Sequence, residues 1–174
     1  MASLDFVDNK LPVALTNCVR HSVEGIFTTI LGSKTTYCHD GDGEMVGHGI
    51  VGIISFVGDV SWLLMLVLPK ASANSLAAKF TGFEVDYDGP DMGDVVGELA
   101  NVLAGDMVGR LSVAGIKVAM SLPTIMRGND VEPLLPRGIS ADKMFFTSPQ
   151  GDFWLRLAGS KSSVGADTFR KPGT

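Results

Sequence analysis

Hydrophobic residues recur at helical spacing near the start of the chain, which predicts a first long helix over residues 11–31. Its buried face would carry Leu15, Val19, Val23, Ile26 and Ile30. Gly32 follows directly and is typical of a helix end, because glycine adopts the left-handed conformation at little steric cost. A short strand over 34–39 and a turn over 40–43 are expected next.

The stretch 50–68 is almost continuously apolar and is the nearest approach to a membrane span in the sequence. Gly58 and Asp59 interrupt it, and its two halves are rich in Val, Ile, Phe and Trp, which favour strands. We therefore predict strands over 47–57 and 61–68, joined by a tight turn.

Two more helices are expected in the middle of the chain. A short helix over 73–80 would be capped by Ser72 and ended by Gly82. After a loop rich in Gly, Pro and Asp, a second long helix is predicted over 92–111, ending near Gly115.

The segment 117–126 resembles a strand, but Pro123 cannot donate a backbone hydrogen bond and therefore predicts a sheet edge or a bulge there. Two prolines and two glycines within 127–142 indicate a long loop, and such loops are often functional or mobile.

A hairpin is predicted from strands over 143–147 and 153–158. The remainder, 159–174, is rich in Ser, Gly and Lys and is expected to be a disordered tail, so that 1–158 forms a single domain. About three helices and six strands with short connections predict an α+β fold, in which a mostly antiparallel sheet packs with two long helices and a short one.

Composition narrows the function classes. The chain has 174 residues, a net charge of −5 and no basic cluster, which argues against binding of nucleic acid. The two cysteines are too few for the disulfide framework of a secreted protein, and the N-terminus lacks a basic region followed by an apolar run. Both features predict a cytoplasmic setting.

Two candidate metal sites are weak. Four possible zinc ligands match no standard zinc spacing: Cys18, His21, Cys38 and His39. Three acidic residues near two glycines are too few for a calcium loop and indicate a hairpin turn: Asp40, Asp42 and Glu44. His48 is expected in a strand. No nucleophile elbow or phosphate-binding glycine loop is present in the sequence.

The second long helix carries a polar stripe that its packing does not explain. Four residues fall within about 60° of arc on a helical wheel: Asp94, Glu98, Asn101 and Gly105. The opposite side is apolar: Val96, Leu99, Leu103 and Met107. Asn and Gly both disfavour a helix interior, by about 0.5 to 1 kcal/mol relative to Ala. A glycine there also leaves room for another molecule to approach.

This stripe has a sequence context that resembles a known family. The pattern Asp94-x-x-x-Glu98-x-x-Asn101 is followed by Ala104-Gly105 and later by Ser-Leu-Pro-Thr-Ile-Met-Arg-Gly over 121–128. Together they resemble the chemotaxis phosphatases of the CheC, CheX and FliY group, most closely the CheX branch.

The resemblance implies hydrolysis of the aspartyl phosphate on a response-regulator receiver domain such as CheY. Asn101 would hold the attacking water in line, and Glu98 would pair with the receiver's lysine. Asp94 would contact the receiver or cap the helix, and Gly105 would lie at the partner surface. The receiver supplies Mg²⁺, so the protein needs no cofactor of its own. The resemblance also implies a homodimer.

Two other interpretations remain open from the sequence. A non-catalytic module would dock a receiver or a flagellar-switch-type partner through the same helix face. A small-molecule sensor would instead use the 127–142 loop as a lid.

Overall fold

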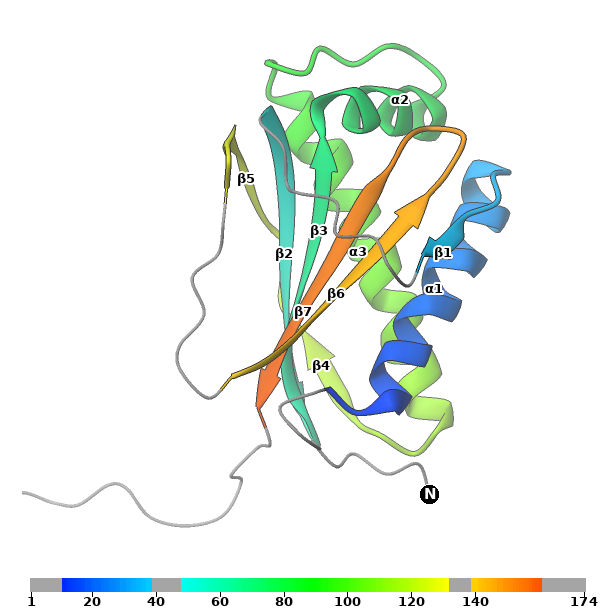
Figure 1. Ribbon diagram of the computed structural model, residues 1–174, viewed down its shortest axis with the longest axis vertical. Helices are drawn as coiled ribbons and strands as arrows, with labels where there is room; N and C mark the ends of the chain where they lie inside the picture. The colour runs from blue at the N-terminus through cyan, green and yellow to red at the C-terminus, as the bar shows by residue number, and fades with distance from the viewer. Residues whose placement is uncertain (1–10, 39–47, 132–138, 161–174) are drawn as a thin grey trace, which may run out of the picture.

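The computed structural model describes residues 11–38, 48–131 and 139–160 (Figure 1). Within these ranges, three helices pack on a seven-stranded sheet, which confirms the predicted α+β class. The helices are α1 (Val13–Leu31), α2 (Lys70–Thr81) and α3 (Asp91–Val113). The strands are β1 (Thr36–Cys38), β2 (His48–Gly58), β3 (Ser61–Pro69), β4 (Val118–Met120), β5 (Thr124–Asn129), β6 (Ser140–Thr147) and β7 (Phe153–Ser160).

The strands are ordered β1-β6-β7-β3-β2-β4, and β5 also pairs with β2. Every pairing is antiparallel, as the short connections predicted. The apolar stretch 50–68 forms the β2–β3 hairpin, which turns at Gly58 and Asp59. In the described part of the chain, none of the helices is long and apolar enough to span a membrane.

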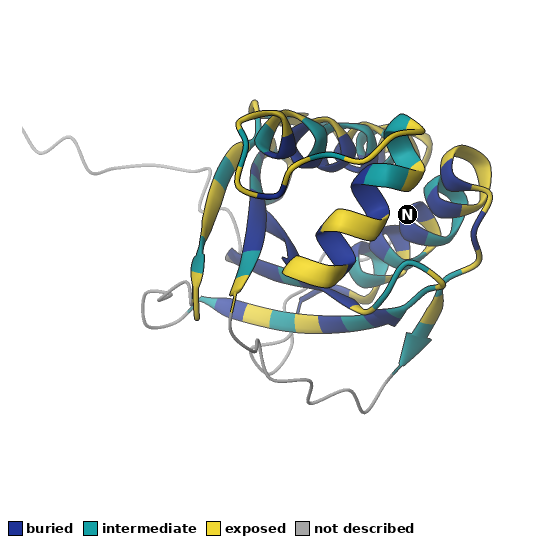
Figure 2. Ribbon diagram, turned by 90° about the horizontal axis from the view of Figure 1, so that it is seen from above, coloured by how far each residue is buried: buried dark blue, intermediate teal, exposed yellow. Residues whose placement is uncertain are grey.

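All three helices lie on the same face of the sheet (Figure 1) and share the main core with it. Buried and exposed residues alternate around the helices, so that each presents an apolar side to the core (Figure 2). A smaller apolar cluster lies on the other face of the sheet and contains Val51, Met65, Val67, Trp154 and Ala158.

Two of the predicted helix ends are confirmed and one predicted cap is wrong. Gly32 and Gly82 end α1 and α2 in the left-handed conformation, with φ of 58° and 84°. However, α2 already begins at Lys70, because Pro69 precedes it with a backbone conformation suited to a helix start. Ser72 therefore lies inside the helix, where its hydroxyl donates to the carbonyl of Asp152 at 2.7 Å.

The strand predicted over 117–126 is divided at Pro123. Pro123 was expected to mark either a sheet edge or a bulge, and both are found. Strands β4 and β5 pair one after the other with β2, and residues 121–123 form the bulge between them. Ser121 fastens this bulge, since its hydroxyl accepts from the backbone N–H of Ser55 at 3.0 Å and its own N–H donates to the Ser55 carbonyl at 2.9 Å.

The prediction of a long loop over 127–142 is wrong at both ends of this segment. Residues 127–129 belong to β5, and residues 140–142 belong to β6. Pairing with β2 and β7 satisfies the backbone at these positions, and such tertiary pairing overrides a local preference for turns. The middle of the predicted loop, 132–138, lies outside the described residues.

Near the C-terminus, β7 continues through Ser160, beyond the boundary predicted at residue 158. Its partners are β3 and β6, and the β6–β7 pair is the predicted hairpin. The tail 161–174 and the turn predicted over 40–43 lie outside the described residues.

Candidate functional site

The polar stripe is held in place by the apolar side of α3. Leu99, Leu103 and Met107 are buried against the core. Where α3 crosses β2, Ala100 lies over Gly52, and a Cβ built on Gly52 would be 3.2 Å from the Cβ of Ala100. The helix therefore approaches the sheet closely because Gly52 has no side chain, and this packing fixes the direction of the opposite face.

On that opposite face the structure brings the predicted site residues together. Asp94, Glu98 and Gly105 are exposed and Asn101 is half-buried, all on α3. Residues three apart on a helix have Cβ atoms about 5–6 Å apart, so Glu98 and Asn101 are close enough to enter one pocket of a partner.

The fold makes no use of the polar ends of these two side chains. Within the described residues, the side chains of Glu98 and Asn101 form no hydrogen bond and no ion pair. Asp106, on the same helix, differs, because it is paired with Arg110 at 2.5 Å. An exposed acid and a half-buried amide without internal partners are available for an external one.

The suggestion that Asp94 caps α3 is wrong. Pro90 occupies the N-cap position and no side chain caps the helix. Asp94 lies in the first turn with Asp91, where a carboxylate interacts favourably with the helix dipole by about 0.3 to 1 kcal/mol. Contact with a partner remains the other prediction for Asp94.

Gly105 is not required by packing within the protein. A Cβ built at this position meets no other atom within 4 Å, and the same is true of Gly109. The space beside this part of α3 is therefore open, although alanine would stabilise the helix more.

The β4–β5 bulge flanks the stripe on its Asn101 side. Pro123 packs on α3 at Gly97, where a Cβ would be 3.7 Å from the Cγ of Pro123. Its neighbour Leu122 is 85% exposed. Leu122 was not among the predicted site residues, although an apolar residue directly before a bulge proline was a signal that could have identified it.

Arg127, in β5, anchors the loop that leads into α3. Its guanidinium donates to the carbonyls of Tyr87, Asp88 and Gly89, with distances of 2.9 Å to Asp88 and 3.1 Å to Gly89. Tyr87 is buried, and its ring centroid lies 4.6 Å from the Nζ of Lys70 and 5.7 Å from the Cζ of Arg127. Burial raises the pKa of the Tyr87 hydroxyl. Arg127 had been assigned to a loop, so its role in placing the helix was missed.

The residues considered as zinc ligands have other surroundings. Cys18 is buried between α1 and α3, with its Sγ 3.6 Å from the Met107 carbonyl oxygen, and burial raises its pKa to about 11. His21 is exposed on α1, and Cys38 lies in β1. Over the described ranges, no group of three or more potential ligands is placed to hold a metal. His39 and the acidic residues of the suggested calcium turn lie outside these ranges.

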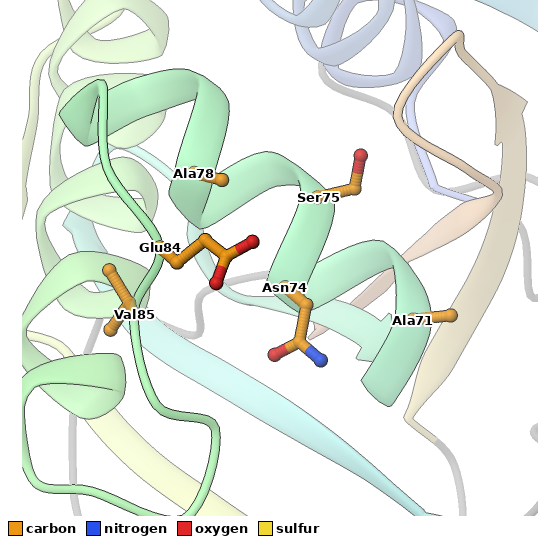
Figure 3. A pocket seen from close by; sticks show the side chains of 6 residues that line it. All are labelled: Ala71, Asn74, Ser75, Ala78, Glu84 and Val85. Carbon is orange, nitrogen blue, oxygen red and sulfur yellow. The ribbon is translucent and has the colours of Figure 1, made fainter.

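A cleft of about 420 Å³ lies beside α2 (Figure 3). It is lined by Ala71, Asn74, Ser75, Ala78, Glu84 and Val85. These residues come from α2 and the segment after it, with no contribution from the stripe or from the 127–142 segment. The cleft therefore gives no support to the sensor interpretation, which needed a pocket under that segment.

The fold is shared with solved chemotaxis proteins. The chain is similar to CheX from Desulfovibrio desulfuricans, with a TM-score of 0.74 and 14% identity over 85% of this chain and 100% of that one. For CheX from Vibrio vulnificus the TM-score is 0.73, with 18% identity over 84% and 99% of the two chains. The structure of a CheX–CheY–BeF3–Mg²⁺ complex from Borrelia burgdorferi gives a TM-score of 0.65, with 16% identity over 90% and 99%. The fold thus defines a CheC/CheX-like α+β domain.

The sequence comparison narrows this class to one family. The model of the chemotaxis phosphatase CheX family matches residues 50–141, more than half of the chain, from β2 through the start of β6. This match includes all of α3 and its stripe. The chain belongs to the CheX family of chemotaxis phosphatases. No curated protein sequence matches it.

Proposed function

We propose that the protein hydrolyses the aspartyl phosphate of a CheY-like receiver domain, with Asn101 orienting the water and Glu98 docking the receiver. Membership of a chemotaxis phosphatase family supports the reaction class. The observation that carries the proposal is that Glu98 and Asn101 project from a firmly packed helix and have no partner within the described chain. Such side chains can enter the active site of another protein.

The reaction needs little covalent chemistry from this chain. Water attacks phosphorus, the bond between phosphorus and the aspartyl oxygen breaks, and inorganic phosphate and a free carboxylate result. Phosphoryl transfer has a loose transition state that is helped mainly by positioning and electrostatics. The Asn101 amide would hold the water in line, while the receiver contributes the acyl phosphate and its Mg²⁺. A CheX–CheY complex with BeF3 and Mg²⁺ is known from Borrelia burgdorferi and agrees with this division.

Glu98 has a different role in the proposal. Its exposed carboxylate would pair with the receiver's lysine and thereby set the position of α3 over the phosphoryl site. Asp91 and Asp94 lie one to two turns earlier and add negative charge to this end of the helix. A negative surface favours encounter with a basic group on a partner.

The test is the decay rate of a phosphorylated CheY-like receiver from the same organism, with catalytic amounts of the protein. Asn101→Ala should lower kcat about 10²- to 10³-fold, the loss seen when one preorganised amide donor is removed. The fold should persist, since alanine favours helices more than asparagine does. Asn74→Ala is the matched control, because Asn74 is also an asparagine within a helix, and its side chain is exposed. Full activity of folded Asn101→Ala would refute the assignment.

Glu98→Gln separates docking from chemistry. It removes the charge while keeping the shape, so it should raise KM for the phosphorylated receiver more than it lowers kcat. Binding of the receiver without faster phosphate loss by the wild-type protein would instead favour a non-catalytic docking module.

A further inference from the structure

Leu122 is an exposed leucine that the fold does not use. It is 85% exposed at the centre of the β4–β5 bulge, while the residues on either side of it are anchored. Ser121 is hydrogen-bonded to the backbone of Ser55 on β2, and Pro123 packs on Gly97 of α3. The bulge therefore presents Leu122 to solvent from a fixed position.

That position borders the polar stripe. Gly97 precedes Glu98 directly and lies one turn before Asn101, about 40° from it around the helix. Since Pro123 contacts α3 at Gly97, the bulge lies along the side of the helix from which Asn101 projects. Leu122 is the apolar neighbour of the proposed catalytic surface on this side.

We propose that Leu122 is an apolar contact for the receiver domain, bound next to the receiver's phosphoryl pocket. This inference rests on the proposed function. The side chains of Asn and Glu are short, so they reach a phosphoryl group only if the receiver surface is in direct contact with α3. A receiver seated in this way also covers the adjoining bulge. The open space at Gly105, for which the fold gives no reason, agrees with such a close approach.

The chemistry of the contact defines the partner that it selects. Leucine gains free energy from burial against carbon and none from a charged or polar group. Leu122 therefore favours receivers that have an apolar side chain at the rim of the aspartyl pocket. The pocket itself is shared among receivers, so a rim contact can discriminate between them while Glu98 and Asn101 cannot.

The experiment measures binding to a CheY-like receiver loaded with beryllofluoride and Mg²⁺, together with steady-state hydrolysis of the phosphorylated receiver. Leu122→Ser should raise Kd about tenfold, equivalent to about 1.4 kcal/mol. The effect on turnover should fall on KM, because the contact is made equally in the ground and transition states. Leu122→Met should restore most of the affinity.

Val113→Ser is the matched control. Val113 is 91% exposed at the end of α3, about 18 Å along the helix axis from Asn101, and its substitution should change neither constant. Unchanged Kd and KM in Leu122→Ser, with wild-type hydrolysis intact, would overturn the Leu122 inference and leave the proposed function standing. Binding that needs Leu122 but is not followed by hydrolysis would overturn the phosphatase assignment alone. Absence of binding by the wild-type protein would overturn both.

Discussion

Gly105→Ala should make the protein more stable and less active at the same time. Gly105 lies in the interior of α3, where glycine is less favourable than alanine by about 0.8 to 1 kcal/mol. A Cβ at this position meets no atom within 4 Å, so no steric term opposes the gain. For a protein of this size, the increase corresponds to a rise in Tm of about 2 to 4 °C.

The expected loss of activity comes from the partner side. Gly105 is one turn beyond Asn101 on the same stripe, about 6 Å along the helix axis. In the proposed complex the receiver surface lies against this turn, and an added methyl group would hold it away from Asn101. Overpacking of a fitted interface by one methyl group costs about 1 to 3 kcal/mol, so kcat/KM should fall at least fivefold.

Thermal unfolding and receiver dephosphorylation measure the two effects separately. Gly109→Ala is the control, since Gly109 is also exposed with no atom within 4 Å of a built Cβ, but it lies about 12 Å from Asn101 along the axis. Gly109→Ala should gain the same stability with a smaller loss of activity. A lower Tm for Gly105→Ala would refute the interpretation that the space beside Gly105 on α3 is open. A higher Tm with unchanged kcat/KM would refute close approach of the receiver at this turn.

Two further predictions concern the support of α3. Gly52→Val should lower the free energy of unfolding, measured in urea titrations, by about 1 to 3 kcal/mol, because even a Cβ at Gly52 would lie 3.2 Å from that of Ala100. Unchanged stability would show that α3 and β2 can accommodate a larger side chain at this contact. The free energy of unfolding should fall as pH rises from 9 to about 11, because burial raises the pKa of the Cys18 thiol in the folded state. In that window only the unfolded chain ionises at Cys18, which favours unfolding. Urea titrations of the wild type and of Cys18→Ala check this, and equal pH slopes for the two would contradict it.

The helices and most strands could be predicted from the sequence, because the spacing of their apolar residues and the glycines or prolines at their ends indicate the same elements. Gly32 and Gly82 end helices as expected, and Pro123 marks the bulge. Ser72 was misread because capping residues are also found inside helices, and only the packing of α2 near the β6–β7 turn shows that its hydroxyl meets Asp152.

For the site, the stripe on α3 was predictable but its surroundings were not. Helical spacing alone places Glu98 and Asn101 on one face. That Arg127 holds the loop before α3, and that Leu122 borders the stripe, depends on β5 and the bulge returning to the same edge of the sheet. Such long-range pairing leaves no periodic signal in the sequence. The leucine directly before Pro123 was a local signal for Leu122, whereas the role of Arg127 could be identified only in the structure.

The position of the site on an outer helix face, and not in a cleft, follows from its proposed chemistry. An enzyme that binds its own phosphate ester must enclose it, whereas one that completes a partner's active site must project into it. Projection demands that the helix be rigid, because a misplacement of about 1 Å can cost 10²-fold in rate. The contact of Ala100 with Gly52 and the three carbonyls held by Arg127 supply this rigidity from the sheet. In the proposed function the sheet would thus serve catalysis by fixing α3, and substitutions beneath the helix should act on turnover through the position of Asn101.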